Sequence, residues 1–154
     1  MIISKPVLLI SQAEAEHIKG AKALADANRS IFAFITRQAF EDAHAQKGLL
    51  VARIEAQVVG FVRYYHRKTD QQTTLYDICV AEDWRSQGVG EQLLAALIAD
   101  CIEQAREFIL LKCPAQLAAN QFYARKGFTL ISTQPGKHHE LNVWRLGLLE
   151  AGKQ

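Results

Sequence analysis

Long apolar runs are missing from this sequence, as are the patterns typical of metal-binding or disulfide-stapled chains. No apolar segment approaches the ~20 residues that a helix needs to cross a bilayer, and no small-residue cleavage site predicts a signal peptide. The three cysteines, Cys79, Cys101 and Cys113, are odd in number and widely spaced, which excludes zinc-ligand spacing. We therefore expect buried, reduced thiols in a cytoplasmic protein with no membrane segment and no metal.

The net charge of the chain is also small. The formal charge is +2, which is too small to indicate a nucleic-acid partner by itself. The hydrophobic fraction of 49% and the charged fraction of 22% are ordinary for a globular protein. A length of 154 residues suits one core, so we expect a single domain over residues 1–154.

Hydrophobic periodicity and turn residues predict alternating strands and helices. Ser11 and Glu14 have the spacing of a capping box, so the first helix is expected to start at Ser11. A β-α-β unit over residues 75–112 lies within an otherwise antiparallel pattern, which predicts an α+β fold. The sheet is expected to be mixed and mostly antiparallel, with one parallel crossover and flanking helices. We expect the strands at 6–10, 49–54, 58–66, 75–80, 108–112, 128–132 and 140–146, and later helices at 36–46, 90–106 and 117–126.

The segment from Val80 to Gly90 joins a predicted strand to a long amphipathic helix. Gly88 and Gly90 permit a tight turn and a close approach to a ligand, and the first amides of the helix favour an anion such as a diphosphate. Glu91 replaces the lysine of a P-loop, and Leu93 replaces the third glycine of a dinucleotide-binding fingerprint. On local chemistry alone, a plain strand-to-helix turn without a ligand remains the alternative.

Two motifs carry a family resemblance. Arg85-x-x-Gly88-x-Gly90 resembles the Q/R-x-x-G-x-G/A signature of the GNAT superfamily of acyl-CoA N-acyltransferases. The segment from Asn120 to Phe128, with Phe-Tyr123 and Gly127-Phe128, resembles the second common segment, a helix ending in F-Y-x-x-x-G-F. The order of elements from residue 49 to residue 146 also matches. The resemblance implies a GNAT-like fold, acetyl-CoA as co-substrate and transfer of acetyl to an amine.

The resemblance also implies where the cofactor lies. The pantetheine arm would pair with the backbone of the strand that ends near Val80, as an added strand does. The diphosphate would meet amides at the positive end of the following helix. Arg85 either supports the loop and the phosphates or is a solvated loop charge. The cofactor-binding residues implied in this way are Ile78, Cys79, Val80, Arg85, Gln87, Gly88, Val89, Gly90, Glu91, Asn120 and Tyr123.

Tyr123 and Asp77 are the catalytic candidates. By the resemblance, the Tyr123 phenol would protonate the leaving thiolate, with a packed aromatic ring as the alternative. Asn120, one helical turn earlier, either binds pantetheine amides or only decorates the helix. Lys112 aligns with a glutamate that is a base in some relatives, so Asp77 is the remaining candidate, with a structural hydrogen-bond acceptor as the alternative. Cys79 is interpreted as a buried inert thiol instead of an acyl carrier.

The acceptor amine has no clear signature. The resemblance places its site at residues 28–37 and 138–145, where ordinary packing and capping are the alternative. His138 and His139 fit a solvated turn better than a metal pair. Arg63, His66, Arg67 and Lys68 form a basic cluster, which fits either an acidic substrate or RNA, or a solvated edge that discourages strand pairing.

The sequence therefore predicts an N-acetyltransferase that transfers acetyl from acetyl-CoA to a primary amine of a small molecule or protein by direct attack. The alternatives are a non-catalytic acyl-CoA-binding module and a toxin that acetylates aminoacyl-tRNA, which the small charge disfavours. We expect no nucleic-acid partner and no membrane partner. A homodimer is expected through an apolar sheet edge around Val143, Trp144 and Leu146.

Overall fold

The computed structural model describes residues 6–29 and 34–148, and its helices and strands follow the predicted order. The chain divides into two compact units, which we describe separately. The N-terminal unit holds the described residues up to Tyr64 together with Asp77–Leu97, and the C-terminal unit holds Tyr65–Tyr76 and the described residues from Ile98 onward. Strand β4 (Gln72–Val80) and helix α3 (Val89–Glu103) contribute to both units, as do the last two residues of the strand over Gln57–His66.

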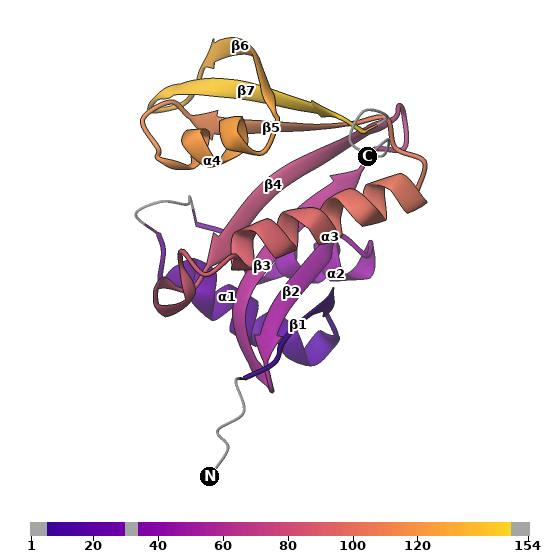
Figure 1. Ribbon diagram of the computed structural model, residues 1–154, viewed down its shortest axis with the longest axis vertical. Coiled ribbons are helices and arrows are strands. Elements are labelled where there is room, and N and C mark those ends of the chain that lie inside the picture. The colour runs from indigo at the N-terminus through magenta and orange to yellow at the C-terminus, as the bar shows by residue number, and fades with distance from the viewer. Residues whose placement is uncertain (1–5, 30–33, 149–154) are drawn as a thin grey trace. The chain divides into compact units, whose positions relative to one another are not determined.

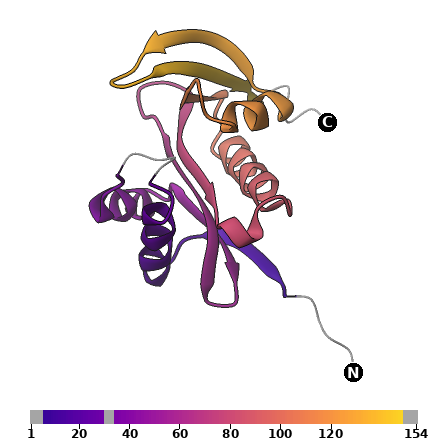
Figure 2. The same cartoon turned by 90° about the vertical axis from the view of Figure 1, so that its left-hand side faces the viewer.

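The N-terminal unit contains three antiparallel strands, β1 (Leu8–Gln12), β2 (Leu49–Ile54) and β3 (Gln57–His66). Helices α1 (Ile18–Asp26) and α2 (Arg37–Ala45) cover one face of these strands, and the first half of α3 lies on the other face (Figures 1 and 2). Consecutive residues of β2, from Leu49 to Ala52, are all buried. Burial of both faces explains why this strand reads as a continuous apolar run instead of an alternating one.

Packing in the N-terminal unit holds each helix close to the strands. The rings of Phe40 on α2 and Phe61 on β3 meet edge to face, with centroids 5.3 Å apart. On the opposite face, a Cβ at Gly60 would lie 3.0 Å from Leu93 Cδ1 and 3.3 Å from Val89 Cγ1. Gly60 therefore lets the start of α3 approach β3 closely, and this contact positions the loop that precedes α3.

The predicted start of the first helix is wrong. Ser11 lies in β1, where it pairs with Val51 of β2, so strand pairing extends past the expected cap. The capping box is formed instead by Glu14 and His17, around a short 3₁₀ turn over Ala15–His17 that leads into α1. The next helix is as predicted, because the hydroxyl of Thr36 accepts a hydrogen bond from the Ala39 amide at its start.

The C-terminal unit is built on β5 (Phe108–Pro114), β6 (Thr129–Pro135) and β7 (Glu140–Gly147), with α4 (Ala119–Arg125) beside them (Figure 1). The first part of β4 pairs parallel with β5, which is the expected crossover. The strand order is β1-β2-β3-β4-β5-β7-β6, so the predicted mixed and mostly antiparallel sheet is confirmed. No helix among the described residues is long and apolar enough to cross a membrane.

The apolar edge proposed for a dimer is not at β7. That strand pairs with β5 on one side and β6 on the other, and Val143, Trp144 and Leu146 are buried. The edge strand of the C-terminal unit is β6, where Leu130 and Ile131 are about half exposed next to a register shift. Sequence order misled here because the last strand inserts between β5 and β6. A homodimer stays a prediction, and β6 is its available edge.

Strand β4 begins at Gln72, three residues earlier than predicted, because polar side chains are buried there. Thr73 is fully buried and its hydroxyl lies 2.7 Å from His66 Nδ1 and 3.5 Å from Cys101 Sγ. The turn before β4 is held by Arg106, whose Nη2 donates to the carbonyls of Arg67, Asp70 and Gln72 at 2.6–2.8 Å. These bonds satisfy three main-chain carbonyls of the turn.

Candidate functional site

The loop between β4 and α3 has a backbone that only certain residues accept. Gly88 has φ +83°, and an added Cβ would meet no atom within 4 Å. Ser86 also has a positive φ of 61°. Glycine at position 88 is therefore required by backbone conformation and not by crowding inside the protein. The space that a side chain at Gly88 would occupy is open.

The first turn of α3 follows this loop directly. The first helical hydrogen bond runs from the Gln92 amide to the Gly88 carbonyl, at 3.0 Å. The amides of Val89, Gly90 and Glu91 therefore precede the first amide that donates within the helix, and amides in this position form the positive end of a helix. The structure places four of the predicted diphosphate residues, Gly88 to Glu91, in one continuous stretch of backbone.

Arg85 is tied to its neighbours on both sides. Its Nε donates to the carbonyl of Val80 at 3.1 Å, and its Nη2 donates to Asn28 Oδ1 at 2.5 Å. Asn28 in turn donates to the carbonyl of Leu24 at the end of α1. Although Arg85 is exposed, it therefore braces the loop against β4 and α1, which agrees with the loop-supporting alternative. Gln87 adds a bond within the loop, from its Nε2 to the Asp83 carbonyl at 3.0 Å.

Asp77 forms an ion pair that the sequence did not indicate. Its Oδ2 lies 2.7 Å from both Nε and Nη2 of Arg63 on β3, and both side chains are less than one-fifth exposed. Arg63 pairs in register with Leu49, a residue of the core under α1 and α2, so the pair lies on that face of the strands. Burial raises the pKa of Asp77, and the Arg63 guanidinium partly offsets this rise.

Cys79 is buried, and its thiol is a poor nucleophile. Burial raises the pKa of Cys79 to about 12, the nearby Arg85 lowers it and the Asp77 carboxylate raises it further. The thiolate that an acyl carrier needs is therefore scarce at neutral pH. Burial raises the pKa values of Cys101 and Cys113 to about 11 as well.

In the C-terminal unit, Asn120 is a hub of hydrogen bonds. Its Nδ2 donates to the carbonyls of Pro114 and Leu117 at 2.9 and 2.8 Å. Its Oδ1 accepts from Asn142 Nδ2 at 3.0 Å and from Trp144 Nε1 at 2.9 Å. The amide therefore joins the end of β5, the start of α4 and the middle of β7, which is more than decoration of a helix. Binding to pantetheine stays a prediction for this residue.

Tyr123 lies in an aromatic cluster on α4. The side chain is only 6% exposed, and its ring meets those of Phe122 and Phe128 edge to face at 5.7 and 5.5 Å. Gly127, with φ +92°, ends the helix as predicted and turns Phe128 back toward Tyr123. Packing therefore holds the phenol ring in one orientation. This is compatible both with a proton donor and with a ring that serves only in packing.

A hollow of about 320 Å³ lies at the paired part of β4 and β5. The ladder ends at the pair Leu75–Leu111, whereas β4 continues to Val80 and β5 to Pro114. Both residues of this last pair line the hollow, together with Tyr76 and Lys112, which come immediately after them. Sequence reasoning missed this hollow, because its lining comes mainly from two strands that are distant in the chain and meet only through their parallel ladder.

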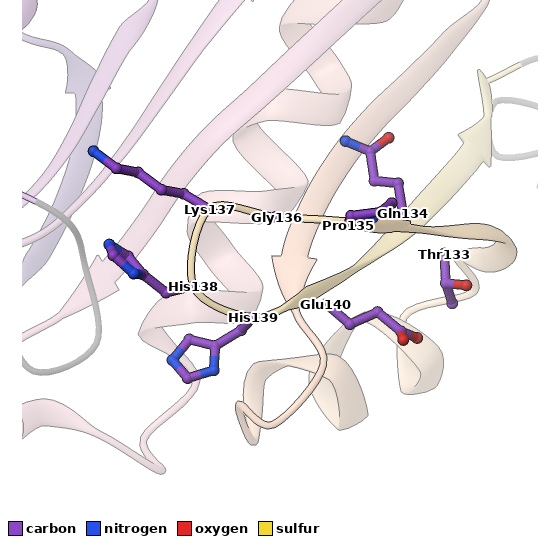
Figure 3. A pocket seen from close by; sticks show the side chains of 8 residues that line it. All are labelled: Thr133, Gln134, Pro135, Gly136, Lys137, His138, His139 and Glu140. Carbon is purple, nitrogen blue, oxygen red and sulfur yellow. The ribbon is translucent and has the colours of Figure 1, made fainter.

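A second hollow, of about 400 Å³, lies in the turn between β6 and β7 and is lined by residues 133–140 (Figure 3). The side chains of Lys137, His138 and His139 fan outward from this turn instead of converging. Among the described residues, no group of three or more His, Cys, Asp or Glu side chains is placed to hold a metal ion. The arrangement agrees with a solvated turn.

The predicted basic cluster is divided among acidic partners. Arg63 pairs with Asp77, His66 Nε2 lies 3.0 Å from Asp100, and Arg67 Nη2 lies 3.3 Å from Asp70. Three of the four residues of the cluster therefore have an acidic partner.

Around the predicted acceptor segment, Phe34 is 56% exposed, with Lys22 Nζ 4.2 Å and Arg29 Cζ 4.9 Å from its ring centroid. Arg37 pairs with Glu41 within α2. Residues 30–33 of this segment lie outside the described part of the chain.

Comparison with known proteins identifies one family. The model of the acetyltransferase (GNAT) domain matches residues 9–143. A comparison with curated protein sequences gives no significant match.

Three solved structures illustrate the likeness in fold. Ard1 from Thermoplasma volcanium has a TM-score of 0.82 and 20% identity, over 91% of this chain and 97% of that chain. The ribosomal-protein-S18-alanine N-acetyltransferase from Escherichia coli has a TM-score of 0.75 and 19% identity, over 92% and 94%. YncA from Salmonella typhimurium, a putative acetyltransferase solved with acetyl-CoA, has a TM-score of 0.76 and 18% identity, over 92% and 94%.

Proposed function

Because the chain belongs to the GNAT acetyltransferase family and is an acyltransferase, we propose that it transfers acetyl from acetyl-CoA to a primary amine. The observation that carries this proposal is the loop at Gly88, where a left-handed glycine with open space beside it leads into the first amides of α3. Such a backbone suits the diphosphate of coenzyme A, because donors are present and no side chain obstructs the approach. The residues assigned to the diphosphate are Gln87, Gly88, Val89, Gly90 and Glu91.

The pantetheine arm is assigned to the backbone of β4 at Ile78, Cys79 and Val80. In support, the parallel ladder with β5 ends at Leu75, five residues before β4 itself ends at Val80. A strand that continues past its ladder offers main-chain groups to an extended ligand. Arg85 is assigned to bracing this segment, since it bonds to the carbonyl of Val80.

In the proposed reaction the amine nitrogen attacks the thioester carbonyl, a C–N bond forms and the C–S bond breaks, with no covalent enzyme intermediate. Asp77 is proposed to take the proton that the amine loses. Its pKa, raised by burial, makes it a stronger base than an ordinary aspartate, whereas the Arg63 ion pair opposes protonation. Tyr123 is proposed to give its phenolic proton to the departing thiolate. High pKa values make the three cysteines poor candidates for an acyl intermediate.

The test is Gly88→Val, with acetyl-CoA affinity measured by calorimetry. We expect binding to fall at least about tenfold, because a β-branched residue strains the left-handed conformation and fills the open space. Ser86→Val is the matched control, because it strains the same loop at a second positive φ but replaces a side chain that is already present. Thermal unfolding of both variants separates lost binding from lost folding. Unchanged affinity in folded Gly88→Val would refute the assignment of the loop.

A further inference from the structure

The hollow on β4 and β5 is lined by positively charged side chains and by no negatively charged ones. Its charged side chains are Arg67 and Lys112, and no Asp or Glu lines it. Arg67 is partly compensated by Asp70, 3.3 Å away, and Asp70 is not part of the lining. Within residues 6–29 and 34–148, no acidic side chain forms an ion pair with exposed Lys112. Lys112 therefore gives the hollow its uncompensated positive charge.

The polar lining is arranged to donate. The amide of Gln72 donates its Nε2 hydrogen to Thr74 Oγ1 at 2.9 Å, so the Thr74 hydroxyl has an acceptor position filled and its own hydrogen is available to another group. Gln72 is itself buried. Donors beside a cation suit a carboxylate or phosphate, and they oppose an ammonium group.

Size and shape indicate a small ligand. A volume of about 320 Å³ is at the lower end of the range for small-molecule sites. Leu110, which is half-buried, supplies apolar surface on which a short hydrocarbon chain can pack, whereas the side chains of Leu75 and Leu111 are buried beneath the strands. The hollow also includes the last residue pair of the β4–β5 ladder, immediately before the β4 segment assigned to pantetheine.

We propose that this hollow binds the anionic group of the acceptor, so that the acceptor is a small primary amine that also carries a carboxylate or a phosphate. The inference rests on the proposed function and deepens it, because it names the substrate class. Lys112 pairs with the anionic group, Thr74 donates a hydrogen bond to it, and Leu110 contacts the chain between acid and amine. Repulsion from Lys112 keeps the amine end of the acceptor out of the hollow.

The first experiment compares matched acceptors in a thiol-release assay with acetyl-CoA. The pairs are 4-aminobutyrate with 4-aminobutanamide, and phosphoethanolamine with ethanolamine, which separate a carboxylate source from a phosphate source. In at least one pair, kcat/KM should be about tenfold higher for the anionic member, mainly through KM, since a charge-assisted hydrogen bond is lost in the neutral one. Lys112→Gln should remove this preference, and Lys112→Glu should reverse it.

Lys19→Gln is the control, because it removes the same charge from an exposed position on α1. It should keep the preference of the wild type. The proposal is overturned if the wild type prefers neutral members in both pairs, or if Lys112→Gln keeps the anionic preference.

The second experiment measures binding without turnover, so that the two proposals fail separately. Calorimetric titration of glutarate and inorganic phosphate into the wild type should show binding of at least one anion, about tenfold weaker in Lys112→Gln and unchanged in Lys19→Gln. If an anion binds in this way but no amine is acetylated, the hollow is supported and the proposed function fails. If neither anion binds to the wild type, the assignment of the hollow is wrong, whatever the acetyl-transfer assay shows.

Discussion

The two units present their candidate site residues in different ways. In the N-terminal unit, the loop before α3 offers main-chain amides, and its geometry depends on the left-handed Gly88 and on the start of a helix. In the C-terminal unit, Asn120 and Tyr123 act through side chains held by hydrogen bonds and ring contacts. A site that binds through main-chain amides should keep its function when a nearby side chain is replaced. A site that acts through a side chain should lose function when that side chain is replaced. The following predictions test this difference, from the largest expected effect to the smallest.

Tyr123→Phe should lower kcat about 100-fold or more while acetyl-CoA affinity stays within about threefold. The substitution keeps the ring and its packing on Phe128 but removes the proton donor. The measurement is steady-state turnover with an accepted amine, under conditions where chemistry limits the rate. Near-normal turnover would make Tyr123 a packing residue.

Asn120→Ala should lower the free energy of unfolding by about 2 kcal/mol, because it leaves the indole of Trp144 without its acceptor and removes the side-chain hydrogen bonds to the carbonyls of Pro114 and Leu117. Chemical denaturation measures this loss. Asn142→Ala removes one of the same hydrogen bonds and should cost less, about 1 kcal/mol. Equal losses in the two variants would contradict the role of Asn120 as a hub.

Asp77→Asn should lower turnover most at pH values above the pKa of Asp77 and below that of the amine, where the carboxylate is charged and the free amine is scarce. Because burial raises the pKa above 3.8, the fall of wild-type activity in acid should occur at a higher pH than for an ordinary aspartate. A pH–rate profile of Asp77→Asn that matches the wild type would exclude Asp77 as the base.

The free energy of unfolding gives an independent check on the raised pKa of Asp77. A raised pKa means that folding favours the protonated form. The contribution of Asp77 to stability is therefore fully present below pH 3.8 and is lost as the pH rises through the raised value. Asp77→Asn cannot ionise, so the difference in free energy of unfolding between wild type and variant should change over that interval and level off above it.

Gln87→Ala should have the smallest effect, with acetyl-CoA affinity within about threefold of the wild type. The variant loses one exposed hydrogen bond to the Asp83 carbonyl and keeps every main-chain amide of the loop. Calorimetry beside Gly88→Val makes the comparison direct. A loss for Gln87→Ala as large as that for Gly88→Val would mean that the side chains of this loop bind the cofactor.

Local features of the fold could be predicted wherever one residue determines the backbone. The helix expected over residues 36–46, Gly127 at the end of α4 and the bounds of β2 are as the sequence indicated. Ser11 misled, because its pairing with Val51 depends on a strand 40 positions away. Local capping preference cannot compete with an extended ladder, since each added pair satisfies further backbone groups.

The candidate site could be located from the glycine motif, but its side-chain partners could not. Arg63 lies 14 residues before Asp77 and Asn28 lies 57 residues before Arg85, and no local pattern joins either pair. The charge of the hollow was equally hidden, because Lys112 becomes significant only beside Thr74 on a neighbouring strand. Such pairs depend on tertiary structure, which periodicity and propensity do not encode.

The bond between Arg85 and Asn28 also bears on how this chain can diverge. Arg85 belongs to the glycine motif, whereas Asn28 follows α1 and makes no part of that motif. A substitution at either position leaves the other without its partner, so the two should change together among descendants of this sequence. The residue found at position 28, just after α1, should then vary with the residue found at position 85 in the loop before α3.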